Sequence, residues 1–287
     1  MTQATVVSAR TTPSNYLYYR HTLAVRIMHW TNVLSLTILL MSGLMIFNAH
    51  PSLDWGKSSS TGKPSLLQIT SRDAGNGQLI GITRVLGHEF NTTGLLGASK
   101  NAEGKPSDVA FPHWITIPGF YSLADARAWH FFFAWLFVIN GIAYVLYSAV
   151  SRHLQRDLLP TKTDVRGIGR SIIDHILFRH PQGEDAKRYN VLQKLAYIAV
   201  IFVLLPGIIV AGWAMSPWLN SIFPGWVDLL GGRQSARTLH FILAWLLVVF
   251  VMIHVFEVII SGLWNHLRSM ITGRYRIKGS TQGARHE

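Results

Sequence analysis

The chain contains no cysteine, which excludes several classes of redox and structural site. Without thiols it can form no disulfide, no cysteine-ligated iron–sulfur cluster, no covalent c-type haem and no thiolate metal site. Histidine, of which the sequence has 13, is left as the main side chain able to ligate a metal.

Charged residues are also scarce. They make up 14% of the chain, against roughly 25% in soluble domains, while 49% of the residues are hydrophobic. Acidic residues are the rarer kind, with 14 against 26 basic ones, for a formal net charge of +12. A basic excess can indicate nucleic-acid binding, but here the basic residues flank long apolar segments. The composition therefore predicts an integral membrane protein in a lipid bilayer, with no nucleic-acid partner.

Four segments are long and apolar enough to cross a bilayer, which takes about 20 residues. The expected transmembrane helices are residues 22–47, 124–150, 190–215 and 235–264. The first apolar run is too long for the core of a cleaved signal peptide, so we expect it to be retained. The predicted fold class is an all-α membrane protein, a four-transmembrane-helix bundle that forms a single membrane domain over residues 1–287.

The connections differ in length and character. Residues 48–123 form a long polar segment with a possible hairpin near 66–86, too long for a bare loop, and we expect an ordered cap or docking surface there. Residues 151–189 carry many basic residues and apolar residues at helical spacing, which predicts an amphipathic helix lying on the membrane. Residues 1–21 and 265–287 are expected to be tails.

The distribution of basic residues predicts the topology. They concentrate in both tails and in residues 151–189, whereas the loop before the last helix has only Arg233 ahead of Arg237. By the positive-inside rule, both termini and the 151–189 loop are expected in the cytoplasm. The 48–123 insertion then lies in the periplasm, and the protein is a multi-pass protein of the bacterial cytoplasmic (inner) membrane.

Four histidines fall inside the expected spans: His29, His130, His240 and His254. The last two are 14 residues apart on one helix, which returns them to nearly the same face about 21 Å apart along the axis. The expected topology places His29 and His254 near the inner ends of their helices. It places His130 and His240 near the outer ends.

Histidines within a membrane are by default candidates for a functional site. Interhelical hydrogen bonding is the simpler alternative for any one of them. Two pairs at matched depths favour bis-histidine ligation of b-type haem, whose iron takes an axial imidazole from each side. Zinc or copper would normally require three or four ligand side chains clustered around one ion. We therefore predict two haem b groups, bound by the pairs His29/His254 and His130/His240.

An internal similarity supports this prediction. Residues 127–138 and 237–248 match at seven of twelve positions, including Arg127 with Arg237 and His130 with His240. Arg26 likewise precedes His29 by three residues. An arginine three residues before a ligand shares its helix face, so these arginines are candidates for binding haem propionates. Ordinary snorkelling of helix-end arginines is the alternative.

Polar residues near the inner ends of the helices are candidates for a quinone site. Glu257 follows His254 by almost one turn and is a candidate proton relay, or alternatively an interfacial acid paired with a cytoplasmic base. Asn32, Trp264 and His266 are further candidates. Two glycines in the spans, Gly43 and Gly141, are weaker candidates for admitting the macrocycles.

At these residues the chain resembles the four-helix di-haem cytochrome b subunits of membrane-bound nickel–iron hydrogenases and formate dehydrogenases. Within that group it is similar to the thiosulfate reductase cytochrome b subunits. The resemblance covers all four spans and is carried by Arg26-x-x-His29-Trp30, Trp129-His130, Arg237-x-x-His240 with His254, Tyr189 to Tyr197, and Ala214-Met-Ser-Pro217. It implies the same two ligand pairs, a quinone site near the inner haem and a periplasmic redox subunit.

These observations predict a di-haem subunit that transfers electrons between the quinone pool and a periplasmic redox partner. The resemblance implies a hydrogenase-like partner; because the first connection is longer than in the hydrogenase type, a molybdenum-cofactor oxidoreductase is the other expectation. A stand-alone quinone oxidoreductase acting on a small oxidant is an alternative. A membrane transporter is another, for which Pro206-Gly207 in the third span is the one hint.

Overall fold

The computed structural model describes residues 15–59, 62, 64–75, 77–100, 104–177 and 190–277. The chain divides into two compact units. Unit 1 contains residues 1–27, 148–198 and 253–287, and unit 2 contains residues 28–147 and 199–252.

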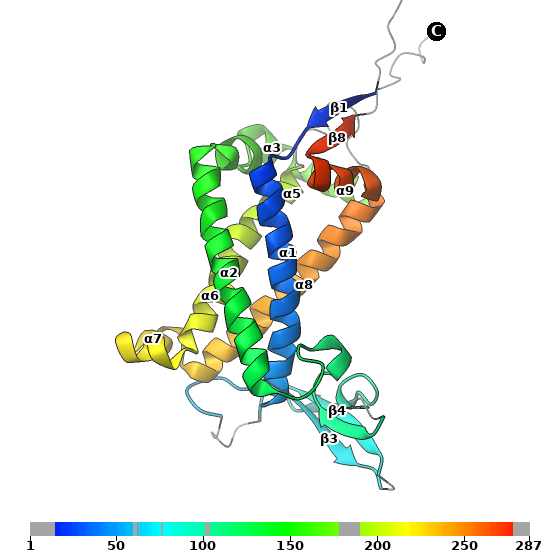
Figure 1. Ribbon diagram of the computed structural model, residues 1–287, viewed down its shortest axis with the longest axis vertical. Helices are drawn as coiled ribbons and strands as arrows, with labels where there is room; N and C mark the ends of the chain where they lie inside the picture. The colour runs from blue at the N-terminus through cyan, green and yellow to red at the C-terminus, as the bar shows by residue number, and fades with distance from the viewer. Residues whose placement is uncertain are drawn as a thin grey trace, which may run out of the picture. The chain divides into compact units, whose positions relative to one another are not determined.

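Four helical segments are long and apolar enough to cross a membrane (Figure 1). They are α1 (Leu23–Asn48), α2 (Leu123–Val150), the segment Val191–Ala214, and α8 (Arg233–Ile260). The first three begin and end within one residue of the expected bounds. The predicted four-helix membrane fold is confirmed, and the chain is mostly helical, although its connections also contain β-strands.

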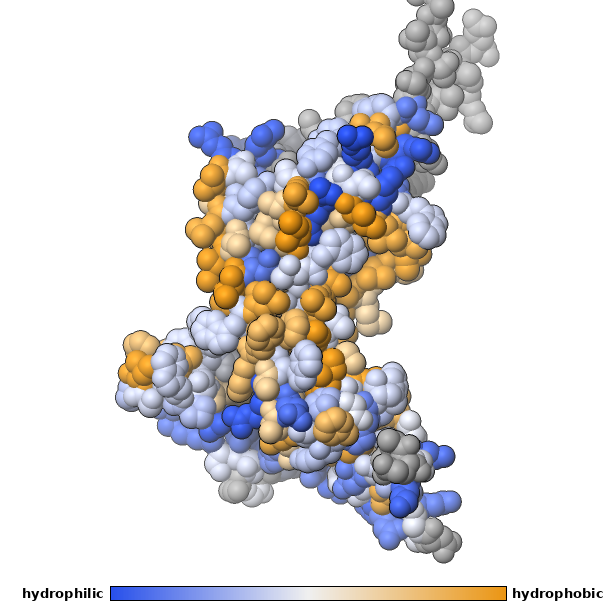
Figure 2. Space-filling view, in the orientation of Figure 1, coloured by the Kyte–Doolittle hydropathy of each residue, from blue (hydrophilic) through white to orange (hydrophobic). Residues whose placement is uncertain are grey.

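The apolar residues of these helices are largely uncovered by protein. Only 6% of the most apolar window of α8, and 11% of that of the third segment, is buried. Figure 2 shows hydrophobic residues, in orange, on the surface of the long helices. A soluble protein rarely exposes so much contiguous apolar surface. Lipid hydrocarbon suits such a surface, and a helix can lie in it because the backbone polar groups of its interior are hydrogen-bonded to one another.

The third membrane segment is not one regular helix. It consists of α5 (Val191–Ala199), the π-helical turn η4 (Val200–Leu204) and α6 (Leu205–Ala214). Pro206 lies at the start of α6 and has no N–H to donate, and its ring would clash with the carbonyl one turn earlier in a regular α-helix. The wider turn at η4 accommodates this proline.

The last span ends earlier than expected. α8 stops at Ile260 rather than 264, and α9 (Leu263–Thr272) follows as a separate helix. Gly262 separates them with a φ of 112°, a conformation that residues with a side chain rarely adopt. Trp264 therefore lies on α9 and not on the membrane helix.

In unit 1 the two ends of the described chain pair with each other (Figure 1). β1 (Tyr16–Tyr19) and β8 (Arg274–Ile277) form an antiparallel pair in which Tyr18 faces Tyr275. The Arg20 guanidinium lies 4.9 Å from the centre of the Tyr275 ring. Both ends therefore lie on one side of the membrane, as an even number of spans requires; that this side is the cytoplasm stays a prediction.

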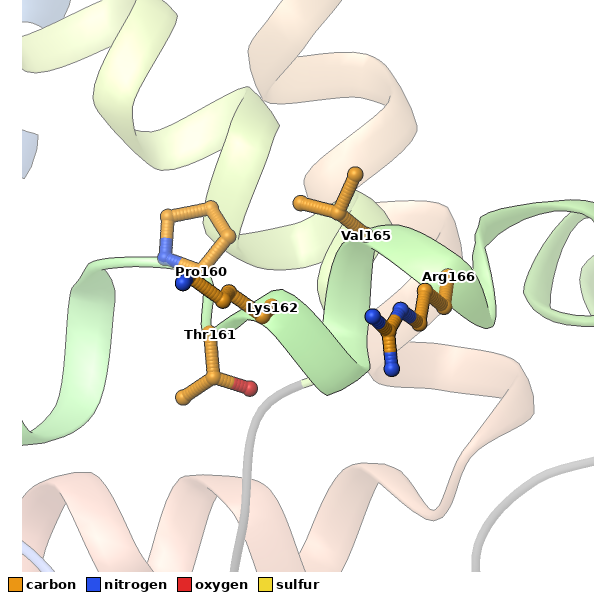
Figure 3. Close-up of a pocket in the computed structure, with 5 residues that line it drawn as sticks. All are labelled: Pro160, Thr161, Lys162, Val165 and Arg166. Carbon is orange, nitrogen blue, oxygen red and sulfur yellow. The ribbon is translucent and has the colours of Figure 1, made fainter.

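The connection between the second and third spans is helical. It contains the π-helical turn η2 (Leu154–Leu158), α3 (Lys162–Arg166) and α4 (Ile168–Ile176). All three lie within residues 151–189, where an amphipathic helix was predicted. Val165 on α3 and Ile172 and Ile173 on α4 are exposed. Figure 3 shows a shallow surface pocket beside α3, lined by Pro160, Thr161, Lys162, Val165 and Arg166. Residues 178–189, which hold the rest of this basic segment, lie outside the described residues.

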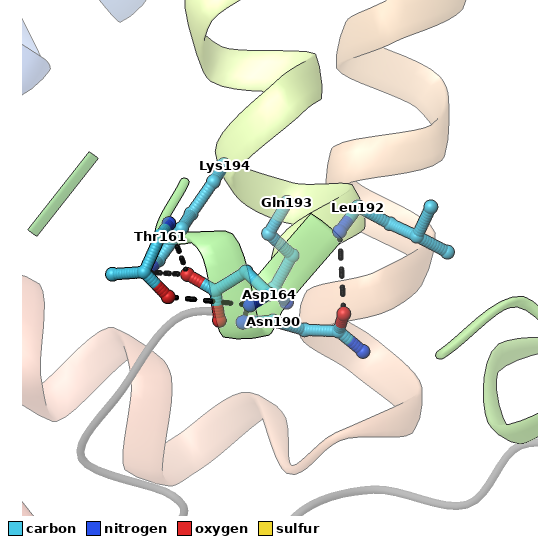
Figure 4. Close-up of polar contacts among 6 residues, drawn as sticks. All are labelled: Thr161, Asp164, Asn190, Leu192, Gln193 and Lys194. Carbon is cyan, nitrogen blue, oxygen red and sulfur yellow. Dashed lines mark hydrogen bonds and ion pairs between the residues drawn. The ribbon is translucent and has the colours of Figure 1, made fainter. Parts of the chain in front are cut away.

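A polar network joins this connection to the start of the third span (Figure 4). The Lys194 ammonium donates to Asp164 Oδ2 at 2.8 Å. The same oxygen accepts from the Thr161 N–H at 2.8 Å, while the Thr161 hydroxyl accepts from the Asp164 N–H. The carboxylate thus caps α3 and holds it to α5 at the same time.

In unit 2 the described residues of the long first connection form a β-rich cap. A four-stranded antiparallel sheet has the order β2 (Ser52–Leu53), β3 (Leu67–Asp73), β4 (Leu79–Val85) and β5 (His88–Asn91). The expected hairpin near 66–86 is β3 with β4, in which Leu67 faces Val85 and Asp73 faces Leu79. β6 (Gly97–Lys100) and β7 (Pro106–Val109) form a second pair, and η1 (His113–Ile115) leads towards α2.

This cap is attached to the membrane helices by a shared core. Leu44 and Phe47 of α1 pack with Leu53, Ile69 and Phe111 of the connection. Polar contacts add to the core at the start of α8. The Thr238 hydroxyl donates to the Asp54 carbonyl at 2.7 Å, and the Gly56 N–H donates to the Ser235 hydroxyl at 2.8 Å. α7 (Pro217–Ile222) and η5 (Trp226–Leu230) complete the loop that precedes α8.

Candidate functional site

The structure brings His130 of α2 and His240 of α8 together in unit 2. Their ring centres are 6.2 Å apart, and the ring planes are inclined by 63°. Both side chains come from the repeated Arg-x-x-His motif, which starts one turn inside each helix. The predicted outer pair is therefore a pair of neighbours in space.

The hydrogen bond of His240 decides which ring nitrogen carries its proton. Nδ1 lies 2.9 Å from the carbonyl oxygen of Ile208 on α6. A carbonyl oxygen can only accept, so Nδ1 must be the donor. In the neutral ring Nε2 then holds the free lone pair, which is the atom available to a metal.

His130 is oriented in the same way, through a serine. Its Nδ1 lies 3.1 Å from the Ser42 hydroxyl oxygen of α1. The Ser42 hydroxyl donates its own hydrogen to the Ile38 carbonyl at 2.6 Å, so towards the imidazole it can only accept. Nδ1 of His130 therefore carries the proton. The lone pair of its Nε2 is left available to a metal, as in His240.

A glycine lies against the ring edge of each histidine. A methyl group added at Gly43 of α1 would lie 3.4 Å from Cε1 of His130, and one added at Gly212 of α6 would lie 3.3 Å from Cε1 of His240. At Gly141, by contrast, an added methyl group would have nothing within 4 Å. The Nδ1–Cε1 edge of each imidazole therefore packs against a neighbouring helix.

The spacing of the two rings fits one shared metal ion. Metal–imidazole bonds are about 2.0–2.1 Å long, and the centre of an imidazole ring lies about 1.1 Å from its nitrogen. Two axial imidazoles on one metal then have centres about 6.3 Å apart, against the 6.2 Å between His130 and His240. Ligating histidines also usually donate from the other ring nitrogen to a carbonyl or similar acceptor, as these two do. Within the described parts of the chain, no cluster of three or more His, Cys, Asp or Glu residues could hold a metal ion.

The predicted inner pair is split between the two units. His29 lies in unit 2 and its ring meets Trp30 edge-on, with centres 5.4 Å apart. His254 lies in unit 1, where its ring centre is 6.5 Å from that of Tyr197 on α5. Both histidines are half-buried. Their pairing stays a prediction.

The three predicted propionate-binding arginines contact protein groups. Arg237 donates to the His50 carbonyl and lies 5.5 Å from the centre of the Phe47 ring. The Arg127 guanidinium lies 5.6 Å from the centre of the Phe131 ring, and Arg26 donates to the Ile271 carbonyl. Arg237 and Arg26 contact other segments of the chain, whereas Arg127 contacts its own helix, and propionate binding stays a prediction.

The four quinone-site candidates are not gathered in one unit. Asn32 lies in unit 2, where its Oδ1 accepts from Asn140 at 2.7 Å. Glu257, Trp264 and His266 lie in unit 1: Glu257 is half-buried, Trp264 is 80% exposed, and the His266 ring centre lies 5.3 Å from that of Tyr275. A quinone site formed by these residues stays a prediction.

Sequence reasoning missed Ser42 and Asn140. Both are polar residues in otherwise apolar spans, and both are buried, at 0% and 8% exposure. Asn140 donates to the Met28 carbonyl at 2.8 Å, one residue before His29. The available signal was their position within the membrane segments, where a polar side chain needs a partner.

Comparison with known proteins gives the family. The model of the family described as prokaryotic cytochrome b561 matches residues 20–273, which include all four spans and all four histidines. The chain belongs to this family. Its members are b-type cytochromes, so this is a multi-pass membrane electron-transfer subunit of the kind that serves oxidoreductases.

Two relatives carry names that agree with this assignment. The chain is 26% identical over 246 residues to the "Putative protein-methionine-sulfoxide reductase subunit YedZ1" of Azospira oryzae, which covers 84% of this chain and 91% of that protein. It is 27% identical over 158 residues to the "Probable Ni/Fe-hydrogenase B-type cytochrome subunit" of Cupriavidus necator, covering 50% of this chain and 64% of that protein. No solved structure matches.

Proposed function

We propose that this chain binds two haem b groups and carries electrons across the inner membrane between the quinone pool and a periplasmic redox subunit. The observation that carries the proposal is the pair His130 and His240, with ring centres 6.2 Å apart and both Nδ1 atoms engaged. His254 follows His240 by 14 residues on α8, roughly 21 Å along the helix, and this spacing supports a second haem at a different depth in the membrane.

The residues of the chain position the two haems and insulate them. Iron in a bis-histidine b haem exchanges single electrons without opening a ligand position. His130 and His240 would hold the outer group, and His29 and His254 the inner one. The apolar faces of α1, α2, α6 and α8 keep water out, which limits side reactions of the reduced centres. Glu257, with Asn32, Trp264 and His266, would serve quinone at the inner side.

We propose that the partner is a periplasmic sulfoxide-reducing subunit. The Azospira relative is named as a subunit of a protein-methionine-sulfoxide reductase, and the match covers nearly all of that protein. Reduction of one methionine sulfoxide consumes two electrons and two protons and yields methionine and water. Oxidation of one quinol supplies two electrons and two protons, so the half-reactions balance. A hydrogenase-like partner is the alternative suggested by the Cupriavidus relative.

Haem counting in purified variants tests the ligand assignment. Purified chain should contain two haem b per polypeptide by pyridine haemochrome assay. His240→Leu and His254→Leu should each retain about one haem, because each removes one axial ligand from a different group. His88→Leu, in the exposed strand β5, is the matched control and should retain both. Absence of porphyrin, or full pigment in His240→Leu, would refute the proposal.

Co-purification tests the partner. A tagged chain isolated in mild detergent from its native membranes should bring down a periplasmic oxidoreductase, and the complex should oxidise a quinol analogue when methionine sulfoxide is added. Hydrogen-dependent quinone reduction by the complex would support the hydrogenase alternative instead. Quinol oxidation by the isolated chain with superoxide, without any second subunit, would contradict both.

A further inference from the structure

The outer histidine pair is held by two different kinds of hydrogen-bond acceptor. His240 donates from Nδ1 to a main-chain carbonyl, that of Ile208, at 2.9 Å. His130 donates from Nδ1 to a side chain, the Ser42 hydroxyl, at 3.1 Å. The first acceptor is part of the backbone and survives any substitution. The second is a side chain and depends on the identity of one residue, and the Leu39 backbone also interacts with the His130 ring.

The surroundings of Ser42 fix its role as an acceptor. The side chain is fully buried, with 0% exposure. Its hydroxyl hydrogen is used by the Ile38 carbonyl at 2.6 Å, with the Leu39 carbonyl at 3.3 Å as a second neighbour. Towards Nδ1 of His130, 3.1 Å away, the hydroxyl oxygen can then only accept. The next residue, Gly43, leaves the edge of the ring free to approach α1.

A ligating imidazole becomes a stronger electron donor when its second nitrogen donates a hydrogen bond. The stronger donor favours the more highly charged ferric iron, which lowers the reduction potential. Loss of that hydrogen bond should therefore raise the potential of the haem concerned. The tautomer of His130 would also lose the bond that fixes Nε2 as the ligating atom.

We propose that Ser42 is a positioning residue that tunes the outer haem through His130. It fixes the ring orientation and tautomer of His130 and sets the reduction potential of one of the two haems, while leaving the other unchanged. This inference rests on the proposed di-haem function, and it assigns to α1 a role at the outer haem in addition to the ligand His29 that α1 is predicted to give to the inner one.

Redox titration of Ser42→Ala tests the proposal. The substitution removes one oxygen atom and creates no large cavity. One haem should become easier to reduce by about threefold or more in its equilibrium constant, or about 28 mV at 59 mV per tenfold for one electron. The second haem should keep its potential, and the low-temperature EPR signal of the shifted haem should change, because that signal reports the axial imidazoles.

Ser35→Ala is the matched control. Ser35 lies on α1 and is as fully buried as Ser42, but its hydroxyl has no hydrogen-bond partner within the described residues. It should leave both potentials and the EPR spectrum unchanged. Should Ser42→Ala lose one haem altogether, Ser42→Thr, which restores the hydroxyl, should recover it.

The outcomes separate the inference from the function on which it rests. Two haems with unchanged potentials in Ser42→Ala would overturn the role of Ser42 and leave the di-haem assignment standing. Equal shifts of both potentials, loss of both haems, or loss of one haem that Ser42→Thr does not recover would also overturn it, since each indicates a general packing role. Absence of haem from the unaltered chain would instead refute the proposed function itself.

Discussion

The side-chain amide of Asn140 on α2 donates a hydrogen bond to the main-chain oxygen of Met28 on α1, at 2.8 Å. Its second hydrogen goes to Oδ1 of Asn32, at 2.7 Å. The two acceptors lie on either side of His29 in the sequence. A buried amide in the apolar span of α2 thus fixes the part of α1 that presents a predicted haem ligand.

Replacing Asn140 by leucine should loosen that part of α1. Interhelical hydrogen bonds in membranes contribute about 0.6 kcal/mol on average and at most about 1.7 kcal/mol, and here two are lost together. We expect about 1 kcal/mol of destabilisation and a roughly fivefold faster loss of one of the two haems on heating in detergent. Thr37→Val is the control, because the Thr37 hydroxyl only donates to Val33 in its own helix. Equal rates of haem loss for both variants would refute the role of Asn140.

The spans could be read from the sequence because hydropathy is local. Stretches such as residues 124–150 contain enough apolar residues to fix their own helical state, and α2 begins within one residue of the expected start. The β3–β4 hairpin was similarly visible as turn residues between apolar ones. The early end of α8 was not, since a glycine in an apolar stretch gives no sign of its backbone conformation until Gly262 is seen at a φ of 112°.

The contacts that orient the candidate ligands could not be read in the same way. Ser42 and His130 are 88 residues apart, and Asn140 and Met28 are 112 apart. No periodicity connects such positions, because their approach depends on how whole helices pack. The pairing of β1 with β8 across almost the entire chain was missed for the same reason. The pair His130 and His240 was predicted from their matched depths in the spans, and an internal repeat that contains both supported it.

The glycines beside the two histidines should be intolerant of larger side chains. Gly212→Val should displace His240, because even a methyl group there would lie 3.3 Å from its ring. We expect loss of about one haem per chain, measured by pyridine haemochrome assay, and a weaker effect of Gly43→Ala, where the contact is 3.4 Å. At Gly141 nothing lies within 4 Å of an added methyl group, so Gly141→Val should leave both histidine rings in place and lower the haem content only if Gly141 itself admits a macrocycle. Full haem content in Gly212→Val would contradict this packing.

The ion pair between Asp164 and Lys194 should make the α3–α5 contact sensitive to acid. The hydrogen bond from Lys194 holds the pKa of Asp164 below its ordinary value, with the Thr161 N–H as the second cause. A carboxylate with a lowered pKa stabilises the fold above the ordinary aspartate value of about 3.9, and that contribution is lost as pH falls through the lower value. The protection factors of residues 161–166, which correct exchange rates for their intrinsic pH dependence, should therefore be high at pH 7 and fall only below about pH 4.

Asp164→Asn should abolish that pH step and destabilise the contact at neutral pH. The Lys194 side chain is only 10% exposed and would be left without its carboxylate, so we expect a cost of about 1 kcal/mol, measured by exchange or by proteolysis of the connection. The double variant Asp164→Asn with Lys194→Met should recover part of this loss, since it leaves no unpaired charge. An unchanged pH profile in Asp164→Asn would show that another group controls the contact.

A substitution at Arg237 distinguishes the two interpretations of the arginine motif, which are binding of a haem propionate and anchoring of the helix end. It already donates to the His50 carbonyl and lies over the Phe47 ring, so Arg237→Gln should loosen the β-rich cap by about 1 kcal/mol whichever interpretation holds. If Arg237 also binds a haem propionate, removal of its positive charge should favour the ferric state and lower the potential of one haem. The comparison variant is Arg233→Gln, one turn earlier in the same helix and exposed. A potential that stays unchanged in Arg237→Gln, together with a loosened cap, would assign this arginine to helix anchoring alone.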